Sequence, residues 1–149
     1  MYKFDSTYNI FNSTQYSSKT FSLKPPVLLD ELDSYRYIVG FIDGDGCIRI
    51  DNKNDLVLAI SSSSFAILDW IRNKLYKIEN QEKYRFPNIN NKQYGIKKDG
   101  SLVEPHWSLR YGCMRAYNIL NYLNDIEVPF KLDRKWNMIN KYKLLKDIK

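Results

Sequence analysis

Two aspartates and two glycines alternate at Asp43-Gly44-Asp45-Gly46, directly after an apolar stretch that contains Gly40. The apolar spacing predicts a helix that ends here, where unpaired carbonyls and the macrodipole are already negative, so each carboxylate costs about 0.3–1 kcal/mol. A cation would offset this charge, and Mg²⁺ takes carboxylate and backbone carbonyl oxygens while keeping waters for chemistry. Asp43 could instead accept local backbone hydrogen bonds, with the glycines forming only a turn. The apolar helix before the segment and the alternating strand after it favour the metal-binding interpretation.

Gly40 and Gly44 lie on one face of the predicted helix, because they are four residues apart. A glycine inside a helix costs about 1 kcal/mol relative to alanine, so two of them at this spacing call for an explanation. Small residues let a second helix backbone approach closely. The pair therefore predicts a tight contact with another helix.

Periodicity places the aspartates between a helix and a hairpin. The helix is expected from about residue 30 to residue 43, with Ile38 and Ile42 on its apolar face. Residues 47–52 and 56–60 alternate apolar and polar side chains, which predicts two paired strands with a turn between them.

The rest of the chain predicts more strands and helices. The further expected elements are a helix over about 65–77, a longer hairpin over 84–111 that turns near residue 100, and helices over about 114–123 and 129–145. The predicted fold class is therefore α+β, with a four-stranded antiparallel sheet covered by helices on one face. The other face, polar and locally basic, is suited to a long partner.

The chain has 149 residues, 44% of them apolar and 27% charged, which predicts a single folded domain. We expect residues 30–149 to form this domain. Residues 1–29 are rich in Ser and Thr and contain Pro25 and Pro26 near their end. We expect them to form an N-terminal arm, which could be a flexible leader or could lie along the body of the protein.

The charge is unevenly distributed. The net charge is +6, and residues 1–46 carry four basic and six acidic side chains while residues 47–149 carry nineteen and eleven. Aromatic residues among the basic ones suit a polyanion, and nucleic acid is favoured over a membrane because no basic amphipathic helix is evident. The alternative is a Lys-rich solvated surface.

Several protein classes are excluded. No apolar run approaches the roughly 18 residues of a membrane span, and no signal peptide is evident, so we expect an intracellular protein. Cys47 and Cys113 form no CxxC motif and His106 is the only histidine, which excludes disulfide scaffolds and zinc modules. The abundance of Ile, Asn, Lys, Tyr and Phe is typical of A/T-rich coding and suggests an organelle, a mitochondrion or chloroplast.

The stretch from Ile38 to Gly46 resembles the signature of the LAGLIDADG homing endonucleases, matching it at Gly40, Ile42, Asp43, Asp45 and Gly46. The resemblance extends over about residues 30–146, because the order of predicted elements agrees with the αββαββα core of the family, whose sheet is saddle-shaped. One copy of the motif is present, so the chain resembles the members that act as homodimers. The resemblance implies a site-specific double-stranded DNA endonuclease of the group I intron or intein type, acting on a long pseudo-palindromic site.

The resemblance also implies roles for the motif residues. In the family the motif helices of two subunits pack together, and their last acidic residues bind metal at the centre of the DNA site. Asp45 would thus be the catalytic metal-binding carboxylate, the Gly44 carbonyl a second ligand, and Asp43 a mainly structural acid. The implied ion is Mg²⁺ or Mn²⁺. The implied dimer interface consists of Ile38, Gly40, Phe41 and Gly44.

Two supporting positions are implied near the catalytic acid. Family members often place a polar residue after the second strand, where Ser64 or Ser63 falls, and a lysine near the last helices to order water and offset charge. Asp133 stands where that lysine is usual, which leaves Lys131 or Lys135 for the role.

The DNA-binding face would be formed by the outward residues of the sheet and its turns, where Arg, Asn and Gln can read base edges and Lys can hold phosphates. These residues are Arg49, Asp51, Lys53, Val57, Ala59, Ser61, Arg85, Asn88, Asn90, Lys92, Gln93, Lys97, His106, Ser108 and Arg110. The alternative is a non-cleaving nucleic-acid-binding protein on the same fold, an intron RNA maturase or a DNA-binding regulator. The two intact aspartates favour the nuclease.

Overall fold

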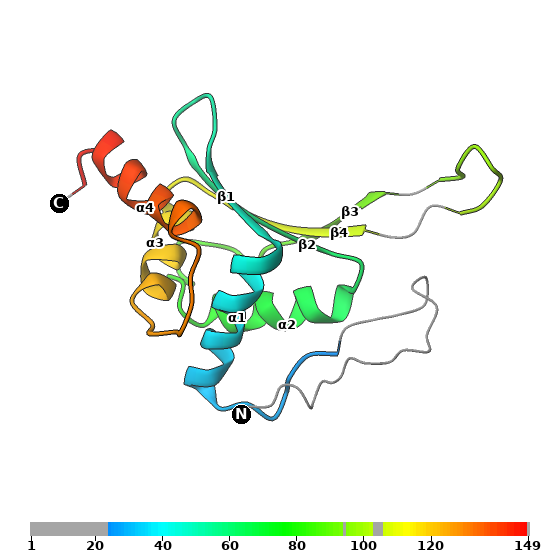
Figure 1. Ribbon diagram of the computed structural model, residues 1–149, viewed down its shortest axis with the longest axis horizontal. Helices are drawn as coiled ribbons and strands as arrows, with labels where there is room; N and C mark the ends of the chain where they lie inside the picture. The colour runs from blue at the N-terminus through cyan, green and yellow to red at the C-terminus, as the bar shows by residue number, and fades with distance from the viewer. Residues whose placement is uncertain (1–23, 94, 103–105, 149) are drawn as a thin grey trace.

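The computed structural model describes residues 24–93, 95–102 and 106–148, which form four helices and a four-stranded sheet (Figure 1). The elements are α1 (Glu31–Asp45), β1 (Gly46–Ile50), β2 (Leu56–Ser62), α2 (Phe65–Tyr76), β3 (Ile89–Gln93), β4 (His106–Gly112), α3 (Cys113–Asn124) and α4 (Asp133–Leu145). The strands lie in the order β1-β2-β4-β3, and every neighbouring pair is antiparallel. The predicted α+β class and four-stranded antiparallel sheet are confirmed. The arm predicted for residues 1–29 stays a prediction, because residues 1–23 lie outside the described part.

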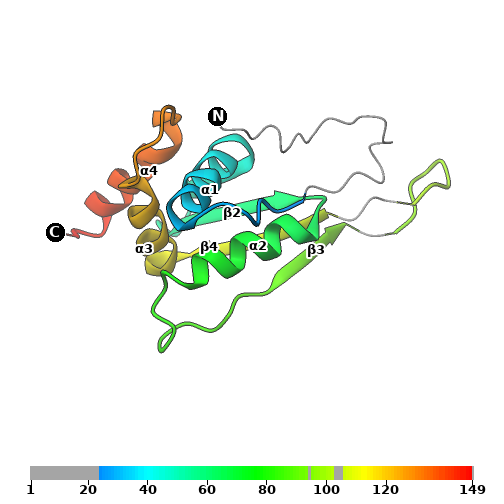
Figure 2. The same cartoon turned by 90° about the horizontal axis from the view of Figure 1, so that it is seen from below.

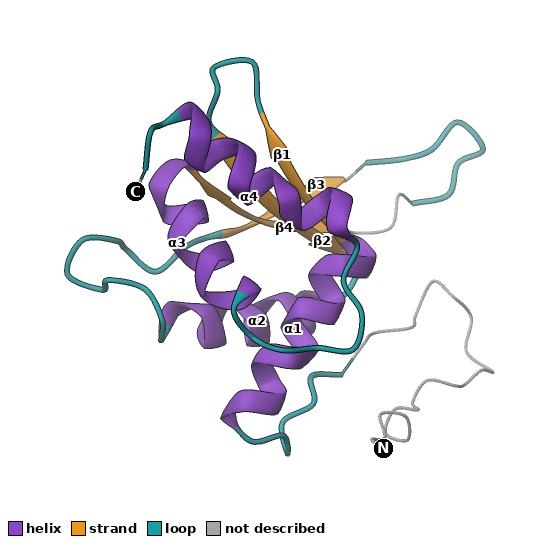
Figure 3. Ribbon diagram, turned by 60° about the vertical axis from the view of Figure 1, so that its left-hand side comes forward, coloured by secondary structure: helices purple, strands orange, loops and turns teal. Residues whose placement is uncertain are grey.

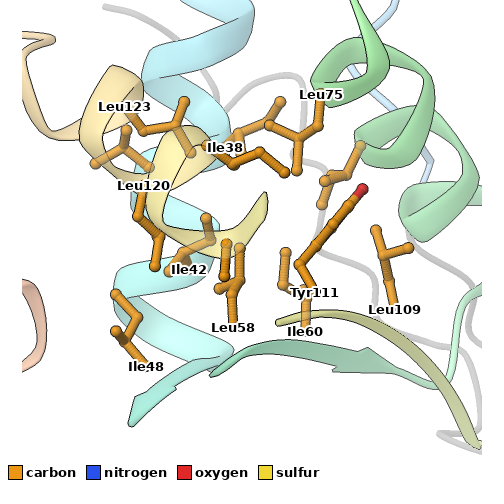
Figure 4. Close-up of a cluster of buried hydrophobic side chains, with 14 of the residues drawn as sticks. Ile38, Ile42, Ile48, Leu58, Ile60, Leu75, Leu109, Tyr111, Leu120 and Leu123 are labelled. Atoms are coloured by element: carbon orange, nitrogen blue, oxygen red, sulfur yellow. The ribbon is translucent and has the colours of Figure 1, made fainter. Parts of the chain in front are cut away.

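The cross-strand register divides the sheet into two faces. Ile48 pairs with Leu58 and Leu58 pairs with Tyr111, so these side chains lie on the same face. All three are buried, and Figure 4 shows them in a cluster with Ile38 and Ile42 of α1. This face is the core face.

The helices lie on the core side of the sheet. Figure 1 shows α1 and α2 on one side of it and the β1–β2 turn rising on the other, and Figure 2, seen from below, shows these two helices in front of the sheet. Figure 3 shows α3 and α4 side by side, and both contact strands, α3 through β2 and α4 through β1. In the described part of the chain, no helix has the length and apolar character needed to cross a membrane.

The helix α1 passes into β1 without a loop. The Gly46 N–H donates to the Ile42 carbonyl, and a Cβ at Gly46 would lie 2.8 Å from the Ile42 backbone, so a side chain does not fit here. The chain changes from helix to strand within one residue. The helix therefore extends two residues beyond its predicted end at Asp43, and Asp45 lies at the junction.

The β1–β2 turn is organised by Asp51. Its Oδ1 accepts hydrogen bonds from the N–H groups of Lys53 at 2.9 Å and Asp55 at 3.0 Å, and Asn54 adopts a positive φ of 64°. The bond from Asp55, followed by that from Lys53, lowers the pKa of the Asp51 carboxyl. One oxygen of the Asp51 carboxylate thus holds the turn, and the prediction that Asp51 contacts DNA stays a prediction.

Two element boundaries differ from the prediction. The last helix begins at Asp133 rather than at Pro129, and β3 begins at Ile89 rather than near residue 84. In both places the backbone bonds to side chains from other elements instead of to a helix or strand neighbour, as described below. These contacts join segments far apart in the sequence, so local periodicity does not predict them.

Candidate functional site

Asp45 lies where α1 meets β1, directly before the first residue of the sheet. It is the last residue of α1 and is exposed, and among the described residues its carboxylate has no hydrogen-bond or ion-pair partner. Asp45 directly precedes Gly46, whose pairing with Ile60 ends the β1–β2 register. Asp45 is thus an available carboxylate at the junction of α1 and β1.

Asp43 has a structural role. Its Oδ1 accepts hydrogen bonds from the Leu132 N–H at 2.7 Å and from the Trp136 Nε1–H at 3.1 Å. The carboxylate therefore lies at the N-terminus of α4, where the helix dipole favours a negative charge. Asp43 joins the end of α1 to the start of α4.

Lys135 supplies a cation to the C-terminus of α1. Its Nζ donates to the carbonyls of Ile42 at 3.1 Å, Asp43 at 2.7 Å and Gly46 at 2.7 Å. The negative helix end predicted from the sequence is thus offset by a lysine, and it does not require a metal ion. Lys135 does not bond the Gly44 carbonyl, which is the oxygen implied as a metal ligand.

The other implied catalytic groups lie elsewhere. Lys131 donates from Nζ to the Asn124 carbonyl at 2.8 Å and to its Oδ1 at 2.9 Å, so it caps the C-terminus of α3. Ser64 is buried and is the N-cap residue of α2. Of the two serines predicted for the catalytic role, Ser63 is exposed and Ser64 is 2% exposed, and the role stays a prediction. Ser61, predicted as a DNA contact, pairs with Ser108 of β4.

The register places many of the predicted DNA-binding residues on the outer face of the sheet, the face opposite the core. Arg49 pairs with Val57, Ala59 with Arg110, and Ser61 with Ser108. Arg110 is exposed, whereas Val57 is 3% and Ser108 5% exposed. Val57 and Ser108 are therefore corrected to packed residues of this face, because side chains with so little exposed surface offer little to DNA.

The remaining predicted contacts lie partly on the second hairpin and partly outside the strands. Asn90 pairs with Ser108 on the outer face, and His106 is half-buried two residues away on β4. The exposed residues outside the sheet are Lys53, Arg85, Asn88 and Lys97. The side chains of Lys92 and Gln93 lie outside what the structure describes.

An open groove runs along the outward side of α1. It has a cavity volume of about 1180 Å³ and is lined by Tyr37, Gly40, Phe41 and Gly44 together with the 127–130 segment. A Cβ built at Gly40 or Gly44 meets nothing within 4 Å. Within the described part of the chain, no helix packs close against these two glycines.

The predicted dimer interface needs one correction. Ile38 is fully buried in the core and offers no surface to a second subunit, whereas Gly40, Phe41 and Gly44 line the groove. Sequence reasoning missed Phe130, which also lines the groove and is 85% exposed. The sequence predicts a helix from Pro129 onward, and a phenylalanine at its second position does not indicate that the side chain is exposed.

A single chain offers few ligands for a metal. Asp45 and the Gly44 carbonyl provide oxygen donors of the kind that a hard divalent ion prefers. Among the described residues, however, no group of three His, Cys, Asp or Glu side chains could hold an ion. The described residues of one chain therefore supply two oxygen donors at this place, a carboxylate and a carbonyl.

Comparison with known proteins leaves the fold and geometry as the basis for assigning a function. No protein-family model matches the chain, and no curated protein has a sequence that matches it.

Proposed function

We propose that the protein is a metal-dependent DNA endonuclease of the LAGLIDADG type that acts as a homodimer on a long pseudo-palindromic site. The observation that carries the proposal is the exposed Asp45 carboxylate, which has no partner among the described residues and lies at the junction of α1 and β1. Lys135 bonds the neighbouring carbonyls and leaves this carboxylate and the Gly44 carbonyl available to a ligand, which supports a functional role.

Asp45 and the Gly44 carbonyl of each copy would hold the ion. A bound Mg²⁺ or Mn²⁺ would lower the pKa of a coordinated water and offset negative charge on the phosphate. Lys135 fixes the carbonyls on either side of Asp45, so it would act as a positioning residue rather than as a general base. Two symmetric copies would give one cut in each strand.

The outer face supplies groups suited to DNA. Arg110, Arg49 and Asn90 share that face, and arginine and asparagine can form paired hydrogen bonds with purine edges in a major groove. Lys53 and Lys97 lie at the two hairpin turns, where they could reach phosphates. An antiparallel sheet with a polar uncovered face can lie along a groove, as β-sheet readers of DNA do.

The groove beside α1 is the proposed dimer interface. Its α1 residues recur every three or four positions, as expected for a helix face that packs on another helix. The open positions at Gly40 and Gly44 allow close backbone approach, and the contact of two identical faces is self-complementary about a twofold axis.

The proposal is tested by incubating the protein with duplex DNA that spans the insertion site of its own gene. We expect double-strand cleavage with Mg²⁺ or Mn²⁺ and none with EDTA. A duplex of the same length with scrambled sequence is the control. Equal cleavage of both duplexes, or cleavage that persists in EDTA, would contradict the proposal.

Gly40→Arg is expected to convert the protein from dimer to monomer. The side chain enters open space in one subunit, so the fold is retained and the helix gains about 1 kcal/mol from the loss of glycine, but a second helix can no longer approach. Sedimentation without DNA or metal measures the change. Ala66→Arg, which also places an arginine at an exposed small residue of a helix, is the control and should remain a dimer. A monomeric wild-type protein would refute the dimer.

A second candidate is a non-cleaving nucleic-acid-binding protein on the same fold, such as an RNA maturase or a DNA-binding regulator. It is favoured by the commitment of both candidate lysines to helix ends, Lys131 to α3 and Lys135 to α1. Tight and selective binding in the same assay, without metal-dependent cuts, would support this candidate over the nuclease.

A further inference from the structure

The segment 77–88, which joins α2 to β3, is held by side chains of two helices. Tyr76 Oη donates to the Tyr84 carbonyl at 3.0 Å, Arg115 Nη2 to the Arg85 carbonyl at 2.7 Å, and Arg72 Nη1 to the Pro87 carbonyl at 3.0 Å. Figure 2 shows the segment running back alongside α2 to β3. Carbonyls in the last residues before β3 are thus fixed from the body of the protein.

Arg115 is fixed by buried partners. Its Nε pairs with the carboxylate of Glu79, a side chain that is only 2% exposed. Its guanidinium lies 5.0 Å from the centroid of the Tyr84 ring and 5.2 Å from that of Tyr111. Burial, and then the Glu79 carboxylate, raises the pKa of the Tyr111 hydroxyl. With its Nε paired to Glu79, the guanidinium is held so that Nη2 reaches the Arg85 carbonyl.

Arg72 makes the corresponding contact from α2. Its Nη2 pairs with Asp69, and its guanidinium lies 4.5 Å from the centroid of the Phe86 ring. A planar guanidinium can hold a carboxylate and a carbonyl in fixed directions at once, which a lysine ammonium does less well. Both arginines therefore depend on their fork geometry as well as on their charge.

The segment leads into an edge strand that needs support. Among the strands that the structure describes, β3 pairs with β4 alone, and its register shifts between Asn91 and Gln93. Arg85, Asn88 and Asn90, all exposed, lie on this strand or just before it. An edge strand with an irregular ladder is held less firmly than a central strand. The path of 84–88 therefore decides where these three side chains lie.

We propose that Arg72 and Arg115 are positioning residues of the nucleic-acid interface, which fix residues 84–88 and so place Arg85 and Asn90 for reading base edges. The inference rests on the proposed function, since it requires that the outer face binds DNA. Neither arginine touches the nucleic acid. Their effect is confined to the bases that lie under the β3 side of the sheet.

The test compares base preferences. Wild-type protein, Arg115→Lys, Arg72→Lys and Arg85→Ala each select from a pool of synthetic duplexes with a randomised centre, and the bound DNA is sequenced. Each lysine keeps a positive charge beside the buried or half-buried carboxylate, but it lacks the planar, forked set of N–H donors of the guanidinium. We expect both lysine variants to lose about tenfold in discrimination at the positions that Arg85→Ala affects, and to keep the other positions. Arg134→Lys, an exposed arginine on α4, is the matched control and should change nothing.

The outcomes distinguish failure of this inference from failure of the proposed DNA-binding function. If wild-type protein selects no duplex, the proposed function fails and this inference fails with it. If wild-type protein selects and the folded lysine variants keep the full preference, only the inference is overturned. Uniform weakening at every position, or loss of folding in both lysine variants, would also overturn it, because the arginines would then be general stabilisers. Hydrogen exchange should show faster exchange of β3 amides in both variants, with the amides of β2 unchanged.

Discussion

Asp45→Asn is expected to abolish metal-dependent cleavage while leaving the protein at least as stable as the wild type. The carboxylate is exposed and has no partner among the described residues, so the amide breaks no contact within them. Removing a negative charge from a helix C-terminus raises the free energy of unfolding by about 0.3–1 kcal/mol at most. Loss of the metal-binding oxygen should reduce the cleavage rate by at least about a hundredfold.

Asp43→Asn makes the same chemical change two residues earlier and serves as the matched variant. Its Oδ1 accepts two hydrogen bonds at the start of α4, so the loss of charge should lower the free energy of unfolding by about 1 kcal/mol. Cleavage by the folded protein should stay within about tenfold of the wild type, because Asp43 is not the proposed ligand. Urea unfolding and cleavage of one duplex measure the two effects.

The proposal is contradicted if Asp45→Asn shows the effects expected for Asp43→Asn, and the reverse. An Asp45→Asn protein that still cuts with Mg²⁺ would remove the assigned ligand. An Asp45→Asn protein that unfolds more easily would show that the carboxylate has a structural partner. A stability gain together with lost activity is the expected signature of a residue kept for function.

The order of elements and the two faces of the sheet follow from local sequence signals. Alternation at 47–50 and 56–60 is enough to place Arg49 opposite the core, because successive residues of a strand face opposite sides. The helical spacing of Ile38 and Ile42 likewise predicts the buried face of α1. The same spacing also shows that Ile38 faces the core, so its assignment to a dimer interface conflicted with a pattern already visible in the sequence.

Contacts between distant segments were not predictable in this way. The hydrogen bonds from Lys135 to the end of α1 join residues about ninety positions apart, and no local pattern indicates them. The negative charge at the end of α1 indicated a cation, for which a metal ion was predicted, and the structure places the Lys135 ammonium on these carbonyls. Arg72 and Arg115 were missed for the same reason, because their carbonyl partners lie on a segment without regular structure.

Lys135→Met is expected to produce the largest loss of stability of any single change discussed here, and to reduce cleavage as well. Methionine keeps the apolar stem but removes an ammonium that donates to three carbonyls at 3.1, 2.7 and 2.7 Å. Hydrogen bonds from a charged group contribute about 1.5–3 kcal/mol each and are not additive, so we expect a loss of about 3 kcal/mol. That is a large part of the roughly 5–15 kcal/mol that stabilises a typical domain.

Lys131→Met separates this effect from the simple loss of a helix-capping lysine. Lys131 donates to two acceptors on Asn124, at the end of α3, so its removal should lower the free energy of unfolding by about 1–2 kcal/mol. The cleavage rate of that variant, measured where it is folded, should be unchanged, because α3 does not carry Asp45. In Lys135→Met the carbonyls that flank Asp45 lose their shared donor, and cleavage should fall even at temperatures where the protein is folded. Equal midpoints of urea unfolding for Lys135→Met and the wild type would refute the positioning role, as would equal cleavage rates for the two methionine variants.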